Sequence, residues 1–192
     1  MTPPRSGRDH ATTRRLAAAA ALASLVAALP AAAADVYPRA LALHQADVPS
    51  GFTLDRARSG VRSNASEVRR HPELATLFAR AGRVTGYSAE FRRGSAFIGS
   101  RADLLLRPQG ARVLLAWYDR EVRKGGVRGL ERSRARVGAE SWVFWEPTSE
   151  LALVAWRYRR VFAAVLGTDL TKEQTLALAR AQQRRIATAL PS

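Results

Sequence analysis

The sequence predicts an α+β domain in which helices pack on an antiparallel sheet of about five to six strands. Three short apolar segments follow one another between residues 141 and 167 with only turns between them, a pattern typical of an antiparallel meander. Stripes with helical spacing stand at residues 74–81, 111–122 and 171–190, so strands and helices do not alternate one by one. Consecutive strands without a helix between them favour α+β over a parallel α/β arrangement.

A leader with the layout of a secretory signal peptide covers residues 1–34. Four arginines come first, and Pro30 and a tract of alanines close the segment. The uncharged run from Leu16 to Ala34 has 19 residues, mostly alanine, whereas a spanning helix needs about 20 predominantly apolar ones. We therefore expect cleavage after Ala34, which releases residues 35–192 as one exported domain, periplasmic or secreted, without a transmembrane segment. An uncleaved anchor is the less favoured alternative, and two adjacent arginines that resemble a twin-arginine signal leave the export route open.

The mature part is basic and has no cysteine. The chain has 31 Lys and Arg against 16 Asp and Glu, and the leader carries four of these bases and one of these acids, so residues 35–192 keep a net charge of +12. Such a charge attracts nucleic acid, anionic lipid or cell-wall polyanions. The bases are scattered and many stand beside acids, as in Asp119-Arg120-Glu121, which favours loose attraction to anionic surfaces over specific nucleic-acid binding. Without cysteine, the domain depends on its core rather than on disulfides.

Residues 36–82 predict two helices with a strand between them. The first helix is short, at residues 36–47. A strand then starts at Phe52 and runs through the Arg56–Arg62 region. An amphipathic helix follows and ends at Gly82, since its apolar residues recur at i, i+3, i+4 and i+7. These residues are Leu74, Leu77, Phe78 and Ala81.

Residues 84–125 predict a hairpin and a long helix. The strands are residues 84–93 and 97–107, and the run Leu104–Leu106 favours burial of both faces of the second strand. The helix follows Pro108, and Asp119 is expected on its outward face. The inward stripe comprises Ala111, Leu114, Leu115, Tyr118 and Val122.

The remaining residues predict the meander and a final helix. The strands at 141–146, 151–158 and 161–167 are nearly continuously apolar, which indicates central positions in the sheet. The last helix runs from Thr171 to about Leu190 and opens with a capping box, because a glutamine stands three residues after the threonine. Gln182 and Gln183 interrupt its apolar stripe, so we expect the middle of this helix to be half covered.

No pattern for metal binding, cofactor binding or nucleophilic catalysis stands out in residues 35–192. This part has two histidines, His44 and His71, without paired ligand spacing. Gly86–Glu90 begins like a nucleophile elbow but lacks its final glycine, so Ser88 is expected to be an outward strand residue. We predict no catalytic residue, no metal ligand and no cofactor, and the sequence favours a non-enzymatic role.

A glycoside hydrolase-like enzyme is one alternative. Glu146 and Glu150 flank a loop next to Trp142, Phe144 and Trp145, which places two acids beside an aromatic platform. Glycosidases need two carboxyl groups at a defined separation. The alternative therefore requires both acids to face one cleft.

The leading hypothesis is an exported binding or accessory domain for a partner protein or a small apolar ligand. Trp156 and Tyr158 alternate with Arg157 and Arg159, so the rings are expected in the core and the arginines on the other face. Trp145, Arg157 and Arg159 are the candidate binding residues. A polyanion-binding protein is the second alternative, because arginines bind phosphates while aromatic rings stack on bases.

Four short segments carry a resemblance to a known group. They are Val48-Pro49-Ser50-Gly51-Phe52, Gly82-Arg83-Val84-Thr85-Gly86-Tyr87, Val137-Gly138-Ala139-Glu140 and Trp156-Arg157-Tyr158-Arg159-Arg160. In these segments and in its layout the chain resembles small exported bacterial α+β domains of unassigned function, similar to the photosystem-accessory (PsbP-like) type. The resemblance implies binding rather than catalysis and carries no catalytic residues.

Overall fold

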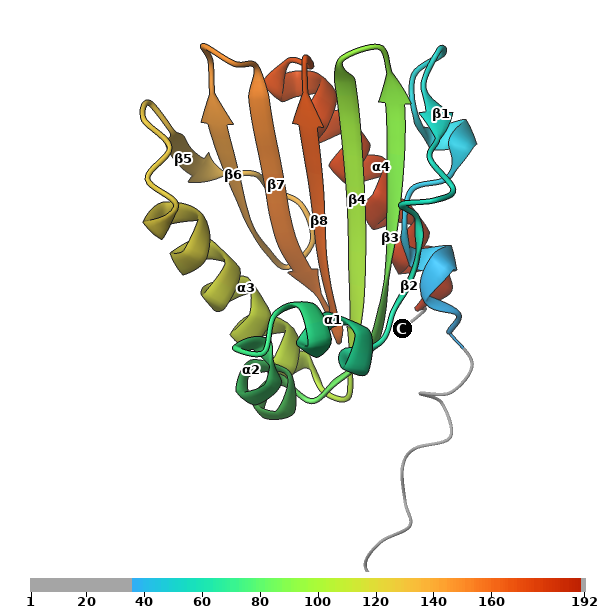
Figure 1. Cartoon of the computed structure of the whole chain (residues 1–192), viewed down its shortest axis with the longest axis vertical. Coiled ribbons are helices and arrows are strands. Elements are labelled where there is room, and N and C mark those ends of the chain that lie inside the picture. Colours follow the sequence, from blue (N-terminus) through green and yellow to red (C-terminus); the bar gives the residue numbers. More distant parts are fainter. Residues whose placement is uncertain (1–35, 191–192) are drawn as a thin grey trace, which may run out of the picture. The chain divides into compact units, whose positions relative to one another are not determined.

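The computed structural model describes residues 36–190, and Figure 1 shows a sheet with helices on both of its faces. The sheet has eight strands in the order β1-β3-β4-β8-β7-β6-β5, and β2 pairs with β3 on the same edge as β1. All pairings are antiparallel. The α+β class is thus confirmed, with more strands than the five to six expected. The leader predicted at residues 1–34 lies outside the described residues.

The five long strands occupy the predicted segments. Leu106 lies beyond the end of β4 and is 46% exposed, so the predicted burial of the leucine run holds only as far as Leu105. The apolar β7 and β8 are central strands, as expected. The long strands are β3 (Arg83–Arg93), β4 (Ala96–Leu105), β6 (Glu140–Glu146), β7 (Leu151–Tyr158) and β8 (Val161–Thr168).

Three short strands account for the difference in strand number. Where a single strand was expected from Phe52 onwards, the structure has two short strands, β1 (Thr53–Leu54) and β2 (Gly60–Arg62). They are separate because the chain turns at Asp55 between them. Its Oδ1 accepts hydrogen bonds from the backbone N–H groups of residues 57 and 58. β5 (Glu131–Arg134) was not predicted, since all four residues are polar and exposed and show no alternation.

The N-terminal segment differs from the single short helix predicted at residues 36–47. It forms two 3₁₀ helices, Pro38–Leu41 and Gln45–Asp47, with extended backbone between them. In the extended part, Leu43 N–H donates to Ser100 Oγ at 3.0 Å. This contact holds the segment against the sheet instead of allowing a continuous helix.

The four α-helices within residues 36–190 divide between the two faces of the sheet. Figure 1 shows α4 behind the sheet and α1, α2 and α3 in front of it. Thr171 caps α4 in the predicted capping box with Gln174. None of the helices in residues 36–190 is long and apolar enough to cross a membrane. The helices are α1 (Asn64–Arg70), α2 (Leu74–Ala81), α3 (Pro108–Lys124) and α4 (Lys172–Ala189).

The strand alternation creates two apolar cores. In β8, Val161, Ala163 and Val165 belong to the core on the α4 side. Phe162 and Ala164 belong to the core that α2 and α3 cover. On this second side, the helices leave part of the sheet uncovered (Figure 1).

On each of two helices, α3 and α4, the predicted exposure of one polar residue is wrong. Asp119 does not face away from the sheet but is buried, with Oδ1 2.6 Å from Arg132 Nε and Oδ2 3.1 Å from Arg123 Nη2. Gln182 does not leave α4 half covered: its side chain is fully buried, accepts from Ser100 Oγ and donates to the carbonyl of Arg101. Both polar groups are buried because a partner satisfies them, which a stripe of residue types does not reveal.

Candidate ligand pocket

The three candidate binding residues from the sequence do not form one site. Trp145 lies at the β6–β7 turn end and is paired with Ala152, whereas Arg157 is paired with Glu140 at the other end of the same hairpin. Five residue steps along a strand separate these ends by roughly 17 Å. Arg159 is further along, in the β7–β8 turn, with a left-handed backbone at φ 51°. A binding role of these residues stays a prediction.

The predicted alternation agrees with the structure for Trp156 and Arg157, whereas Arg159 lies beyond the end of β7. Trp156 is fully buried and its Nε1 donates to Gln183 Oε1 at 2.8 Å. Arg157 faces the opposite side of the sheet, where its Nε lies 2.9 Å from Glu140 Oε2. The aromatic rings of this segment therefore belong to the core and do not form a stacking platform.

Glu146 and Glu150 do not form a pair of catalytic carboxyl groups. Glu146 is buried at the β6–β7 turn, where it accepts hydrogen bonds from the Ser149 hydroxyl and from the backbone N–H groups of Thr148 and Ser149. The Ser149 hydroxyl and then these N–H groups lower the pKa of Glu146 to about 2. A glycosidase acid needs a raised pKa instead. Glu150 is exposed in the turn itself, so the geometry gives no support to the hydrolase alternative.

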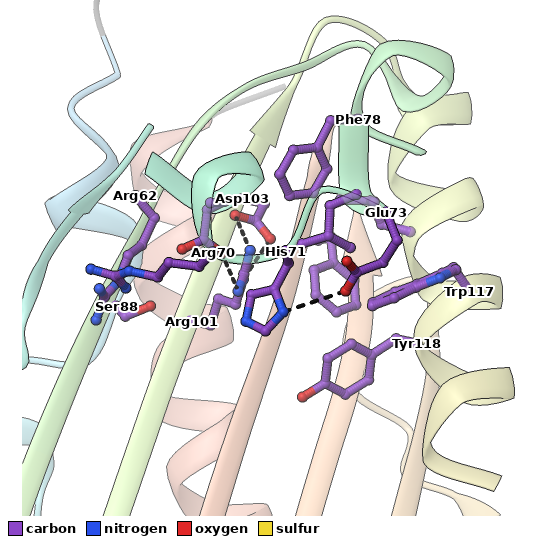
Figure 2. A pocket seen from close by; sticks show the side chains of 14 residues that line it. Arg62, Arg70, His71, Glu73, Phe78, Ser88, Arg101, Asp103, Trp117 and Tyr118 are labelled. Atoms are coloured by element: carbon purple, nitrogen blue, oxygen red, sulfur yellow. Dashed lines mark hydrogen bonds and ion pairs between the residues drawn. The ribbon is translucent and has the colours of Figure 1, made fainter. Parts of the chain in front are cut away.

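A pocket of about 360 Å³ opens on the sheet face that carries α1, α2 and α3 (Figure 2). We call it the aromatic pocket. Apolar rings form its wall, charged side chains form its floor, and further charged side chains lie at its rim. The lining residues are Arg62, Glu67, Arg70, His71, Glu73, Leu74, Phe78, Ser88, Arg101, Asp103, Leu114, Trp117, Tyr118 and Phe162.

Four aromatic rings from three elements form the wall. Phe78 comes from α2, Trp117 and Tyr118 from α3, and Phe162 from β8. The ring centroids of Tyr118 and Phe162 are 5.3 Å apart, and those of Trp117 and Tyr118 are 6.3 Å apart. Burial raises the pKa of the Tyr118 phenol, which Arg101 only partly opposes, so the ring is neutral. This wall suits a flat or branched apolar body.

Asp103 forms the charged floor, and Arg83, which does not itself line the pocket, is its ion-pair partner. The Asp103 carboxylate, on β4, is buried and accepts from Arg83 Nε at 2.9 Å and Nη2 at 2.6 Å. Arg83 is fully enclosed, since it also donates to Asn64 Oδ1 and to the Arg62 carbonyl and stacks on Phe78. These bonds tie the start of α1 to the sheet beneath the pocket.

Arg101 connects this floor to α1. Its Nε lies 2.8 Å from Asp103 Oδ2, and its Nη1 lies 3.1 Å from the buried Glu67. Burial opposes the charge of this guanidinium, but Asp103 and then Glu67 attract it, so the pKa of Arg101 lies above its ordinary value. The floor is therefore a fixed set of guanidinium and carboxyl groups that are bonded to one another.

A second, shallower hollow of about 130 Å³ adjoins the aromatic pocket on the same sheet face. Ser88, Arg101 and Tyr118 line both hollows. The small Gly99 and Ala164 form part of its floor. The two hollows therefore adjoin through three shared lining residues.

Sequence reasoning did not find the aromatic pocket. Its lining comes from seven elements and the α1–α2 connection, between residues 62 and 162, so no single segment carries a local signal. Ser88 was expected to face outward from its strand, and it lies in the pocket half-buried. Within residues 36–190 there is no cluster of three or more His, Asp or Glu side chains that could hold a metal ion.

No protein-family model matches the chain, and no curated protein matches it. A solved structure that it resembles is the extracellular domain of PknH from Mycobacterium tuberculosis, with a TM-score of 0.48 and 9% sequence identity over 77% of this chain and 94% of that chain. A similarity at this level says nothing about a ligand or an activity.

Proposed function

We propose that residues 35–192 act as an exported, non-enzymatic binding domain and that the aromatic pocket holds a small, largely apolar molecule. The single observation that carries this proposal is the meeting of four aromatic side chains around a hollow of about 360 Å³. This volume falls in the range of known small-molecule sites, which is about 300–1,000 Å³. Such sites are mostly apolar with a few polar groups that fix orientation, as here.

Binding is favoured over catalysis because the carboxyl groups at the floor are already bonded to arginines. Asp103 receives hydrogen bonds from two arginines, and Glu67 is paired with Arg101. A general base needs a lone pair within reach of the substrate proton and a pKa near the working pH. His71 is not part of this floor: it is exposed at the rim, 3.4 Å from Glu73, in the connection between α1 and α2. Export of the domain follows from the predicted leader and stays a prediction.

The test uses the neutral fluorescent dye N-phenyl-1-naphthylamine and the mature protein. We expect saturable binding to one site with a rise in dye fluorescence. Ser88→Trp should abolish it, because a half-buried residue that lines both hollows is replaced by a bulky ring. Ser133→Trp is the matched control, since Ser133 is an exposed strand residue outside these hollows and should leave binding unchanged. Circular dichroism confirms that both variants fold.

The other outcomes separate the alternatives. If the wild-type protein does not bind the dye, or if Ser88→Trp binds it as well as the wild type, the aromatic pocket is not the ligand site. The polyanion alternative predicts instead that the protein binds DNA or anionic vesicles with an affinity that falls steeply as salt rises. Native mass spectrometry of protein recovered from its own export route would show a retained ligand or partner directly.

A further inference from the structure

The charges around the aromatic pocket are unevenly compensated. Arg83 and Arg101 are held by Asp103 and Glu67 at the floor. At the rim, Glu73 lies 3.4 Å from His71, which is an ion pair only when the imidazole is protonated. Within the described residues 36–190, the two other arginines that line the pocket, one from β2 and one from the end of α1, have no such acidic partner.

These two arginines are Arg62 and Arg70. Within residues 36–190, neither has a carboxylate oxygen within 4.0 Å. Arg62 donates from Nη2 to the Arg58 carbonyl at 2.6 Å, which is a neutral acceptor and leaves its charge uncompensated. Figure 2 shows the side chains of Arg62 and Arg70 extending to the Ser88 side of the pocket, away from Trp117 and Tyr118.

The pocket therefore has two chemically different ends. At one end, two guanidinium groups and the Ser88 hydroxyl offer hydrogen-bond donors. At the other, Phe78, Trp117 and Tyr118 offer apolar surface. Guanidinium groups bind carboxylate, sulfonate and phosphate oxygens in a forked geometry, and these charge-assisted bonds are stronger than neutral ones.

We propose that the ligand of the aromatic pocket is an amphiphilic anion, whose acidic group is bound by Arg62 and Arg70 and whose apolar body lies against the aromatic wall. The inference rests on the proposed function and adds the chemical class of the ligand. Both a carboxylic acid and a phosphate ester can supply such an acidic group. The compensated floor arginines hold the pocket together and do not provide the ligand charge.

Two dyes with the same anilinonaphthalene skeleton test this proposal. 1-Anilinonaphthalene-8-sulfonate carries a sulfonate that N-phenyl-1-naphthylamine lacks. At low ionic strength we expect the sulfonate to bind at least about tenfold more tightly, since charge-assisted hydrogen bonds differ from neutral contacts by that order. Added salt should reduce this preference, because rim charges exposed to solvent are screened.

The variants assign the preference to the two arginines. Arg62→Gln and Arg70→Gln should each reduce sulfonate affinity severalfold, and the double variant should bind both dyes equally. Arg69→Gln is the matched control, because Arg69 is an exposed neighbour on α1 that does not line the pocket. Competition by 1-naphthoate and by 1-naphthyl phosphate then shows which acid the rim prefers.

The outcomes distinguish this inference from the proposed function. If both dyes bind equally to the wild type, or if Arg69→Gln weakens sulfonate binding as much as the rim variants, the anionic ligand class is wrong while the apolar pocket stands. Sulfonate binding that keeps its wild-type affinity in Ser88→Trp places the anion elsewhere and also overturns the inference. If neither dye binds, the proposed function fails together with the inference.

Discussion

The guanidinium of Arg83 and the carboxylate of Asp103 form an enclosed ion pair, with Nη2 and Oδ1 2.6 Å apart and both side chains at most 2% exposed. The pair joins the first residue of β3 to β4 directly below the aromatic pocket. Two buried charges cost desolvation energy, which a close and well-bonded partner offsets. The pair therefore fixes the pocket floor, and it makes each partner dependent on the other.

The first prediction concerns the loss of one partner. Asp103→Asn should lower the free energy of unfolding by about 3–5 kcal/mol, because Arg83 is left as a buried charge without a counter-ion. The control is Asp55→Asn, which weakens the exposed contacts of Asp55 with Arg58 and Arg92 and keeps a side-chain oxygen for its turn. It should cost at most about 1 kcal/mol. Urea unfolding measures both, and equal losses would contradict a structural role of the pair.

The second prediction concerns Gly86, which lies against this ion pair. A Cβ at this position would collide with Asp103 Oδ1 and Arg83 Nη2. Gly86→Ala should therefore destabilise the fold by about 1–3 kcal/mol or more through overpacking. Thermal and urea unfolding of the variant give the value.

The matched control for this substitution is Gly94→Ala in the β3–β4 turn. Gly94 has φ +59° and no atom within 4 Å of an added Cβ, so only backbone strain opposes alanine. That strain costs about 1–2 kcal/mol. If the Gly94 variant is the less stable of the two, the requirement for glycine at position 86 does not come from the ion pair.

Much of the fold could be predicted because its signals are local. The apolar segments of β7 and β8 and the capping box of Thr171 and Gln174 depend on residues close in sequence. β5 could not be predicted in this way. Its four polar residues form a strand because β6 offers a pairing edge, and Arg132 and Arg134 stack on the Trp142 ring.

The candidate site could not be predicted, because it depends on contacts between distant residues. Arg83 and Asp103 are 20 residues apart, and Asp103 directly precedes an apolar run that indicates only core. Asp119 and Gln182 illustrate the same limit, since both are buried only because distant partners satisfy them. Hydrophobic periodicity tells which face of a helix is apolar, but not where a buried polar network replaces it.

The third prediction concerns that network at Gln182. Gln182→Leu should cost about 1–3 kcal/mol, because the Ser100 hydroxyl loses its acceptor and the Arg101 carbonyl loses a donor inside the core. Ser100→Ala should cost less in the Gln182→Leu background than in the wild type, since the two side chains share one bond. Gln109→Leu, at an exposed position of α3, is the control and should change stability by less than about 0.5 kcal/mol. Strictly additive losses would contradict the proposed coupling.

The fourth prediction concerns pH and Glu146. Hydrogen bonds from the Ser149 hydroxyl and the turn N–H groups lower the pKa of the folded Glu146 to about 2, from the ordinary value of 4.5. The unfolded chain therefore takes up a proton first as the pH falls, so the stabilisation is complete well above 4.5 and is lost towards 2. Glu146→Gln should be less stable than the wild type at pH 7.

This difference should narrow steadily when unfolding is measured from pH 6 down to pH 2.5. Glu150→Gln is the control in the same turn, because Glu150 is exposed, and its difference from the wild type should change little over this range. If the difference in unfolding free energy between Glu146→Gln and the wild type stayed constant over this pH range, the carboxylate charge would not stabilise the turn. A narrowing gap would assign Glu146 to stabilising the β6–β7 turn as an ionised acceptor, which is the reverse of the protonated state that a glycosidase acid requires.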